Sequence, residues 1–136
     1  HLVRDQGAAG SNPVTPTTWP PPEGSTERPL FRKVQRAFLR LGMAVAVRAA
    51  LNRAGVPADA VDEVIVGHGR QAGSGPNPAR QVGHRAGLPH AVPAQTINKA
   101  CASGLQAIAS GAQSLILGES AVVVAGGIES MSRMPY

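Results

Sequence analysis

Helical and strand-like segments alternate along the chain after residue 42, and no other feature constrains the fold as strongly. Segments with helical periodicity are residues 43–54, 79–86 and 101–117. Short apolar runs fall at residues 61–66, 92–97 and 121–125. Strands that alternate with helices pair in parallel, because each helix returns the chain to the same end of the sheet. The sequence therefore predicts an α/β fold with a mainly parallel sheet.

The first apolar run, residues 61–66, is nearly continuous and rich in β-branched side chains. A continuous run without polar alternation is typical of a strand buried on both faces. Gly55 and Pro57 are expected to end the helix before it. That helix should cover one face of the sheet with a stripe made of Val47, Ala50, Leu51 and Ala54.

Residues 67–77 form a predicted loop with four glycines, Gly67, Gly69, Gly73 and Gly75. Their spacing matches neither the dinucleotide-binding fingerprint nor the P-loop, so we do not expect a nucleotide there. Asn77 can cap the following helix and Pro78 suits its first turn, while Gly87 and Pro89 end it.

The segment 101–117 is the clearest helix and contains no charged residue. One side is apolar, and the other side is made of small residues, Ala107, Ser110, Gly111 and Ser114. We therefore expect a helix buried on all sides between two layers. Its length, together with Gln106 and Gln113, argues against a membrane-spanning helix.

The only cysteine, Cys101, lies at the junction of a predicted strand and this helix. The N–H groups at a helix start favour a thiolate and can stabilise an oxyanion, so Cys101 is a candidate nucleophile. The alternative is a buried cysteine that packs as a small apolar side chain. A single cysteine forms no intrachain disulfide, which suits a reducing compartment and a cytoplasmic location.

A nucleophilic cysteine needs a base, but none of the three nearby histidines, His68, His84 and His90, is marked out by the sequence. Each is expected to be exposed or structural. No cysteine and histidine pair has metal-ligand spacing, so no metal is expected.

The first 42 residues differ in composition from the rest. Residues 1–27 hold five of the 12 prolines and no apolar periodicity, which predicts a disordered proline-rich arm. Residues 28–42 are basic and ambiguous, and their apolar positions could belong to one amphipathic helix. The chain begins with His1 instead of methionine, so we expect its true start to lie upstream.

The net charge of +5 could suggest a nucleic-acid partner. Five of the 13 basic residues lie within residues 28–40, and the others are scattered without interleaved aromatic side chains. We therefore expect neither a nucleic-acid nor a membrane partner. A phosphorylated coenzyme gives a better reason for positive charge.

Two stretches in this order suggest a family. They are Asn98-Lys99-Ala100-Cys101-Ala102-Ser103-Gly104 and the segment VVVAGGIESMS at residues 122–132. Residues 77–81 and 61–67 fit the same pattern. Over residues 43–136 the chain resembles the N-terminal, nucleophile-bearing part of the thiolases, which include acetyl-CoA acetyltransferases and 3-ketoacyl-CoA thiolases.

The resemblance implies a thiolase-like half-domain, incomplete relative to the family. It implies that Cys101 is the nucleophile and forms an acyl-thioester as an acyl group passes between coenzyme A thioesters in fatty acid metabolism. These thioesters are substrates, and no bound cofactor is implied. Full-length members are expected to be homo-oligomers. The family's opening strand leads into an Arg-Thr-Pro-Phe-like turn, of which residues 28–31 are at best a degraded version.

In thiolases the activating histidine and a second cysteine belong to motifs that would lie beyond Tyr136. We therefore expect this chain alone to be an inactive fragment. Two alternatives stay open. One is a ketoacyl-synthase-like condensing enzyme, although Asn98 and the Ser103-Gly104 pair favour a thiolase. The other is a non-enzymatic truncated module that binds a full-length thiolase subunit.

Overall fold

The computed structural model describes the backbone of residues 27–131 and the side chains from residue 40 onward. The predicted arm lies outside the described residues, apart from its last residue. In order, the elements are α1 (Glu27–Ala54), a short 3-10 turn (Ala58–Ala60), β1 (Glu63–Gly67), α2 (Pro78–Ala86), β2 (Ala94–Ile97), α3 (Ser103–Leu117) and β3 (Val123–Gly127).

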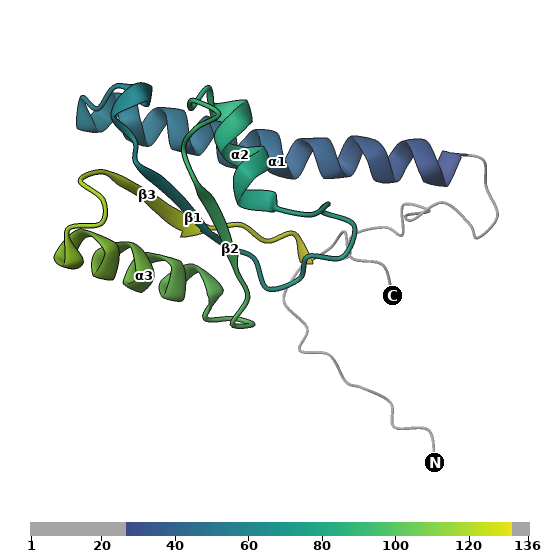
Figure 1. Cartoon of the computed structure of the whole chain (residues 1–136). Coiled ribbons are helices and arrows are strands. Elements are labelled where there is room, and N and C mark those ends of the chain that lie inside the picture. Colours follow the sequence, from purple (N-terminus) through teal and green to yellow (C-terminus); the bar gives the residue numbers. More distant parts are fainter. Residues whose placement is uncertain (1–26, 132–136) are drawn as a thin grey trace, which may run out of the picture.

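The three strands form one parallel sheet in the order β2-β1-β3. Val64 of β1 pairs with Ala94 of β2 and with Val124 of β3. Helices α1 and α2 lie over one face of the sheet and α3 lies over the other (Figure 1). The chain thus crosses from β1 to β2 on one face and returns from β2 to β3 on the other, which confirms the predicted α/β fold with a parallel sheet.

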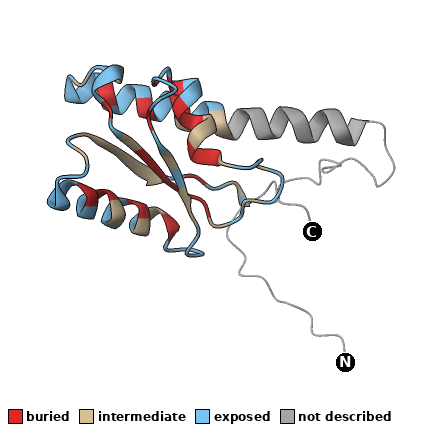
Figure 2. Cartoon of the chain, in the orientation of Figure 1, coloured by how far each residue is buried: buried red, intermediate tan, exposed pale blue. Residues whose placement is uncertain are grey.

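The central strand β1 is buried on both faces. Val64, Ile65 and Val66 are at most 2% exposed. Val64 and Val66 belong to the main core cluster with residues of α1 and α2, and alternation along the strand turns Ile65 towards the opposite face. The prediction from the continuous apolar run is therefore confirmed (Figure 2).

Helix α1 runs without a break through both segments that the sequence analysis kept apart, which agrees with the helical alternative for residues 28–42. Its buried positions are Ala44, Val47 and Leu51, at i, i+3 and i+7. The predicted stripe was wrong at Ala50 and Ala54, which are exposed. These two residues lie off the buried stripe because α1 shares the face of the sheet with α2 instead of covering it alone.

Helix α3 is buried on one side only, so the expectation of a helix buried all round was wrong for the described residues (Figure 2). The side made of small residues faces the sheet, because a Cβ at Gly111 would lie 3.0 Å from Cγ1 of Val123. The large apolar side chains point away from the sheet: Leu105, Ile108, Leu115 and Ile116 are 45–83% exposed. The physical reason is that the described residues supply a single sheet, which can cover only one side.

Among the described residues, Ala100–Leu117 is the one segment whose length and mean hydropathy of 1.2 would suit a membrane span, so the argument from length against such a span was wrong. This segment packs against all three strands, which makes it a layer of the α/β fold.

Candidate functional site

The carboxyl ends of the three parallel strands meet at one edge of the sheet. β1 ends at Gly67, β2 at Ile97 and β3 at Gly127. The connection from β1 to β2 runs in one direction along the sheet, and the connection from β2 to β3 runs in the other. The strand order therefore reverses between β1 and β3. In open α/β sheets ligands bind outside the carboxyl ends of the strands at such a switch point. Cys101 follows β2 at this edge.

Three glycines let the first turn of α3 sit directly on these strand ends. A Cβ at Gly67 would lie 2.2 Å from the backbone carbonyl of Ser103 and 2.4 Å from the nitrogen of Gly104. A Cβ at Gly127 would lie 3.0 Å from Cα of Gly104. A Cβ does not fit at the distances found for Gly67, so the contact there requires glycine, whereas a Cβ at Gly127 would fit only if its neighbour shifted by a few tenths of an ångström. This packing fixes the start of α3 against β1 and β3.

Cys101 is a free and exposed cysteine. The alternative of a buried, small apolar side chain is therefore wrong. Helix α3 begins at Ser103, two residues later than the sequence predicted, with Ala102 as its N-cap. Ala102 makes no side-chain cap hydrogen bond. The exposed thiol thus lies just outside the first turn.

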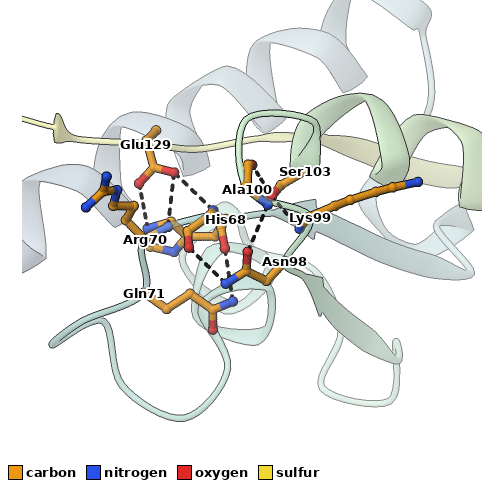
Figure 3. A network of polar contacts seen from close by, with 9 residues as sticks. His68, Arg70, Gln71, Asn98, Lys99, Ala100, Ser103 and Glu129 are labelled. Atoms are coloured by element: carbon orange, nitrogen blue, oxygen red, sulfur yellow. Dashed lines mark hydrogen bonds and ion pairs between the residues drawn. The ribbon is translucent and has the colours of Figure 1, made fainter.

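The turn that contains Cys101 is held by two side chains (Figure 3). Asn98 Oδ1 accepts a hydrogen bond from the N–H of Ala100 at 3.1 Å. Ser103 Oγ accepts one from the N–H of Lys99 at 2.8 Å and donates one to the carbonyl of Ala100 at 2.6 Å. Ala100 takes a left-handed conformation, with φ +48°. The backbone on both sides of the cysteine is thereby fixed.

A second turn, residues 68–70 after β1, is joined to this one. Asn98 Nδ2 donates to the carbonyl of Gly69 at 2.8 Å. Glu129 Oε2 accepts from the N–H groups of Gly69 at 3.0 Å and Arg70 at 3.2 Å. Residues that follow all three strands therefore form one polar network, which includes Ala100, the residue before Cys101 (Figure 3).

His68 belongs to this network as a buried structural residue. It is 1% exposed, and its Nε2 lies 3.5 Å from Oε1 of Glu129. Its Nδ1 has no hydrogen-bond partner among the described residues. Burial lowers the pKa of His68, while the charge of Glu129 and the Arg70 backbone act in the opposite direction. The structure therefore favours the neutral imidazole.

The other two candidate histidines, His84 and His90, are exposed and contact each other, with ring centroids 5.0 Å apart. Within residues 40–131, no hydrogen bond joins any of the three histidines to Cys101. The same residues contain no group of three or more His, Cys, Asp or Glu side chains that could hold a metal ion.

The sequence analysis did not assign Asn98, His68 or Glu129 a place in this network. A usable signal was present: all three lie within four residues of the end of a predicted strand. Because the carboxyl ends of parallel strands meet at one edge, polar residues in these positions are expected to lie together.

Comparison with known proteins supports the resemblance. The model of the thiolase N-terminal domain matches residues 26–136. An acetyl-CoA acetyltransferase from Cupriavidus necator is 54% identical over 93 residues, covering 68% of this chain and 24% of the relative. The mitochondrial acetyl-CoA acetyltransferase B of Xenopus laevis is 52% identical over 92 residues, covering 68% of this chain and 22% of the relative.

The crystal structure of the Bacillus anthracis acetyl-CoA acetyltransferase matches with a TM-score of 0.66 and 46% identity. The match covers 72% of this chain and 25% of that one. The chain thus spans about a quarter of the length of the relatives that it matches. The fold, the motifs and the comparisons agree, and the chain belongs to the thiolase family, of whose fold it covers part of the N-terminal domain.

Proposed function

We propose that this protein acts in acyl transfer between coenzyme A thioesters, with Cys101 as the nucleophile that forms a covalent acyl-enzyme. The observation that supports this most is the exposed thiol at the carboxyl edge of the sheet, directly before the first turn of α3. The relatives named above are acetyl-CoA acetyltransferases, and Cys101 lies in the motif that suggested the family.

In this proposal the thiolate of Cys101 attacks the carbonyl carbon of an acyl-CoA. A bond forms between Sγ and that carbon, the bond to the coenzyme A sulfur breaks, and the coenzyme A thiolate leaves and takes up a proton. The oxyanion of the tetrahedral intermediate would lie near backbone N–H groups at the start of α3. The small, exposed residue Ala102 leaves room for the thioester beside the backbone.

The acyl group then passes to a second substrate, either coenzyme A or the enolate of acetyl-CoA. Both steps need a proton carrier, and no hydrogen bond places His68, His84 or His90 beside Cys101 in the described part of the chain. We therefore propose that this chain alone is acylated once by a reactive thioester and does not turn over.

The compartment and the oligomeric state stay predictions. The cytoplasm and a homo-oligomer are what the sequence led us to expect, and names among the relatives include both cytosolic and mitochondrial enzymes.

The test is incubation of the purified chain with acetyl-CoA, followed by peptide mass spectrometry. The proposal expects one acetyl group on Cys101, removable by neutral hydroxylamine because it is a thioester. Cys101→Ala is the matched control and should lose that label. Acetylation restricted to lysine side chains, equal in the two proteins, would contradict the proposal. Thiolytic cleavage of acetoacetyl-CoA is measured in parallel, and multiple turnovers lost in Cys101→Ala would show that a proton carrier is present in this chain.

A further inference from the structure

Asn98 joins the turn that contains Cys101 to the turn that follows β1. Its Oδ1 accepts from the N–H of Ala100 at 3.1 Å, and its Nδ2 donates to the carbonyl of Gly69 at 2.8 Å. Both polar ends of the side chain are thus used, one on each turn (Figure 3). The second bond holds the side chain against the turn that follows β1.

Ala100 needs such support. It is the one residue other than glycine with a positive φ in the described chain, at +48°. This left-handed conformation is unfavourable for an L-residue with a Cβ, so surrounding contacts must stabilise it. Asn98 binds the N–H of Ala100 from one side, and Ser103 Oγ binds its carbonyl at 2.6 Å from the other. The next residue is Cys101, so the conformation of Ala100 sets where the thiol lies.

We propose that Asn98 is a positioning residue for Cys101. It holds Ala100 in the left-handed conformation and so fixes the thiol relative to the backbone N–H groups at the start of α3. This inference rests on the proposed acyl transfer, because a thioester carbonyl must meet Sγ and those N–H groups together. A small alkylating reagent needs only the exposed thiol.

The first experiment measures amide hydrogen exchange by NMR in the wild type and in Asn98→Ala. Without its acceptor, the N–H of Ala100 should exchange about 5- to 30-fold faster, the range expected when the left-handed state loses its support. Asn77→Ala is the matched control, since it removes an asparagine with the same number of backbone bonds at α2, away from Cys101. It should leave the exchange of Ala100 unchanged. Equal exchange in wild type and Asn98→Ala would overturn the proposal.

The second experiment compares two reactions of Cys101, acetylation by acetyl-CoA and alkylation by iodoacetamide. Asn98→Ala should lower the ratio of acetylation to alkylation about 5- to 30-fold. Asn77→Ala lowers the stability of the fold without touching the turn that contains Cys101, so the folded variant should keep the wild-type ratio. An unchanged ratio in folded Asn98→Ala would overturn the positioning role.

A rescue variant tests the cause. Glycine adopts the left-handed conformation without a Cβ clash, so Ala100→Gly in the Asn98→Ala background should restore most of the ratio. If the ratio of acetylation to alkylation were not restored, Asn98 would not act through the conformation of Ala100. If Asn98→Ala does not fold, Asn98→Asp serves in its place: it keeps the acceptor, so the Ala100 amide should stay protected, and rapid exchange there would overturn the proposal.

The outcomes separate the positioning role from the proposed function. A wild-type chain that iodoacetamide alkylates but acetyl-CoA does not acetylate would contradict acyl transfer. The hydrogen exchange of Ala100 would still decide whether Asn98 holds this turn.

Discussion

Gly67 at the end of β1 and Ser103 at the start of α3 are in direct backbone contact. A Cβ added to Gly67 would lie 2.2 Å from both the carbonyl carbon and the carbonyl oxygen of Ser103. The two residues are far apart in the sequence, and their contact sets the height of α3 above the strand. Cys101 lies two residues before Ser103, so we expect its position at the carboxyl edge of the sheet to depend on this contact.

Gly67→Ala should therefore lower the free energy of unfolding by about 1–3 kcal/mol or more, because the clash is with backbone that no side-chain rotation can relieve. Urea denaturation followed by circular dichroism measures this change. We also expect the first turn of α3 to shift, seen as NMR shift changes at Ser103 and Gly104.

The matched control is Gly42→Ala in α1, where a Cβ would meet nothing within 4 Å. Alanine favours a helix over glycine by about 0.5–1 kcal/mol, so this variant should be slightly more stable than the wild type. Equal effects of the two substitutions would contradict the close contact at Gly67.

Gly67 also shows where sequence analysis reaches its limit. The β-branched run before it predicted the buried strand, and Asn77, Pro78 and Gly87 predicted the bounds of α2, because these signals are local. The contact of Gly67 with Ser103 joins residues from separate elements, so neither sequence segment reveals it alone. The same holds for Glu129, which binds the N–H groups of Gly69 and Arg70 from 60 and 59 residues away.

Asn77→Ala should destabilise the fold by about 1–2 kcal/mol. Asn77 caps α2 by accepting from the N–H of Arg80 at 3.1 Å. It also donates to the carbonyl of Ala94 at 2.9 Å and accepts from the hydroxyl of Thr96 at 2.8 Å, both in β2. The midpoint of urea unfolding measures the loss. Asn52→Ala, at an exposed position inside α1, is the control and should cost nothing, since alanine is the better helix former.

A large side chain should destabilise the fold on the sheet-facing side of α3 and have little effect on its exposed side. Gly111→Leu would place a Cβ 3.0 Å from Val123 Cγ1 and 3.3 Å from Ala125 Cβ, with three further carbons beyond it. We expect a loss of about 1–3 kcal/mol from overpacking against β3. Ala112→Leu, one residue along on the exposed side, should change the stability by less than about 0.5 kcal/mol. Thermal unfolding of the two variants compares them directly, and similar losses in both would mean that the outer side of α3 is covered in solution.

His68 should make the stability of the fold depend on pH in the mildly acidic range. The pKa of His68 in the folded chain lies below the ordinary value of 6.5, and the largest cause is burial of the imidazole. As the pH falls below about 6.5, the unfolded chain therefore binds a proton that the folded chain does not, and the free energy of unfolding decreases until the pH passes the folded pKa.

The measurement is the urea midpoint between pH 7.5 and 5. His68→Gln can still donate to Glu129 but does not titrate, so we expect its midpoint to vary less with pH over this range than that of the wild type. His90→Gln, at an exposed position, is the control and should keep the wild-type dependence. If His68→Gln and the wild type lose stability equally between pH 7.5 and 5, His68 is not the residue that resists protonation in the folded chain.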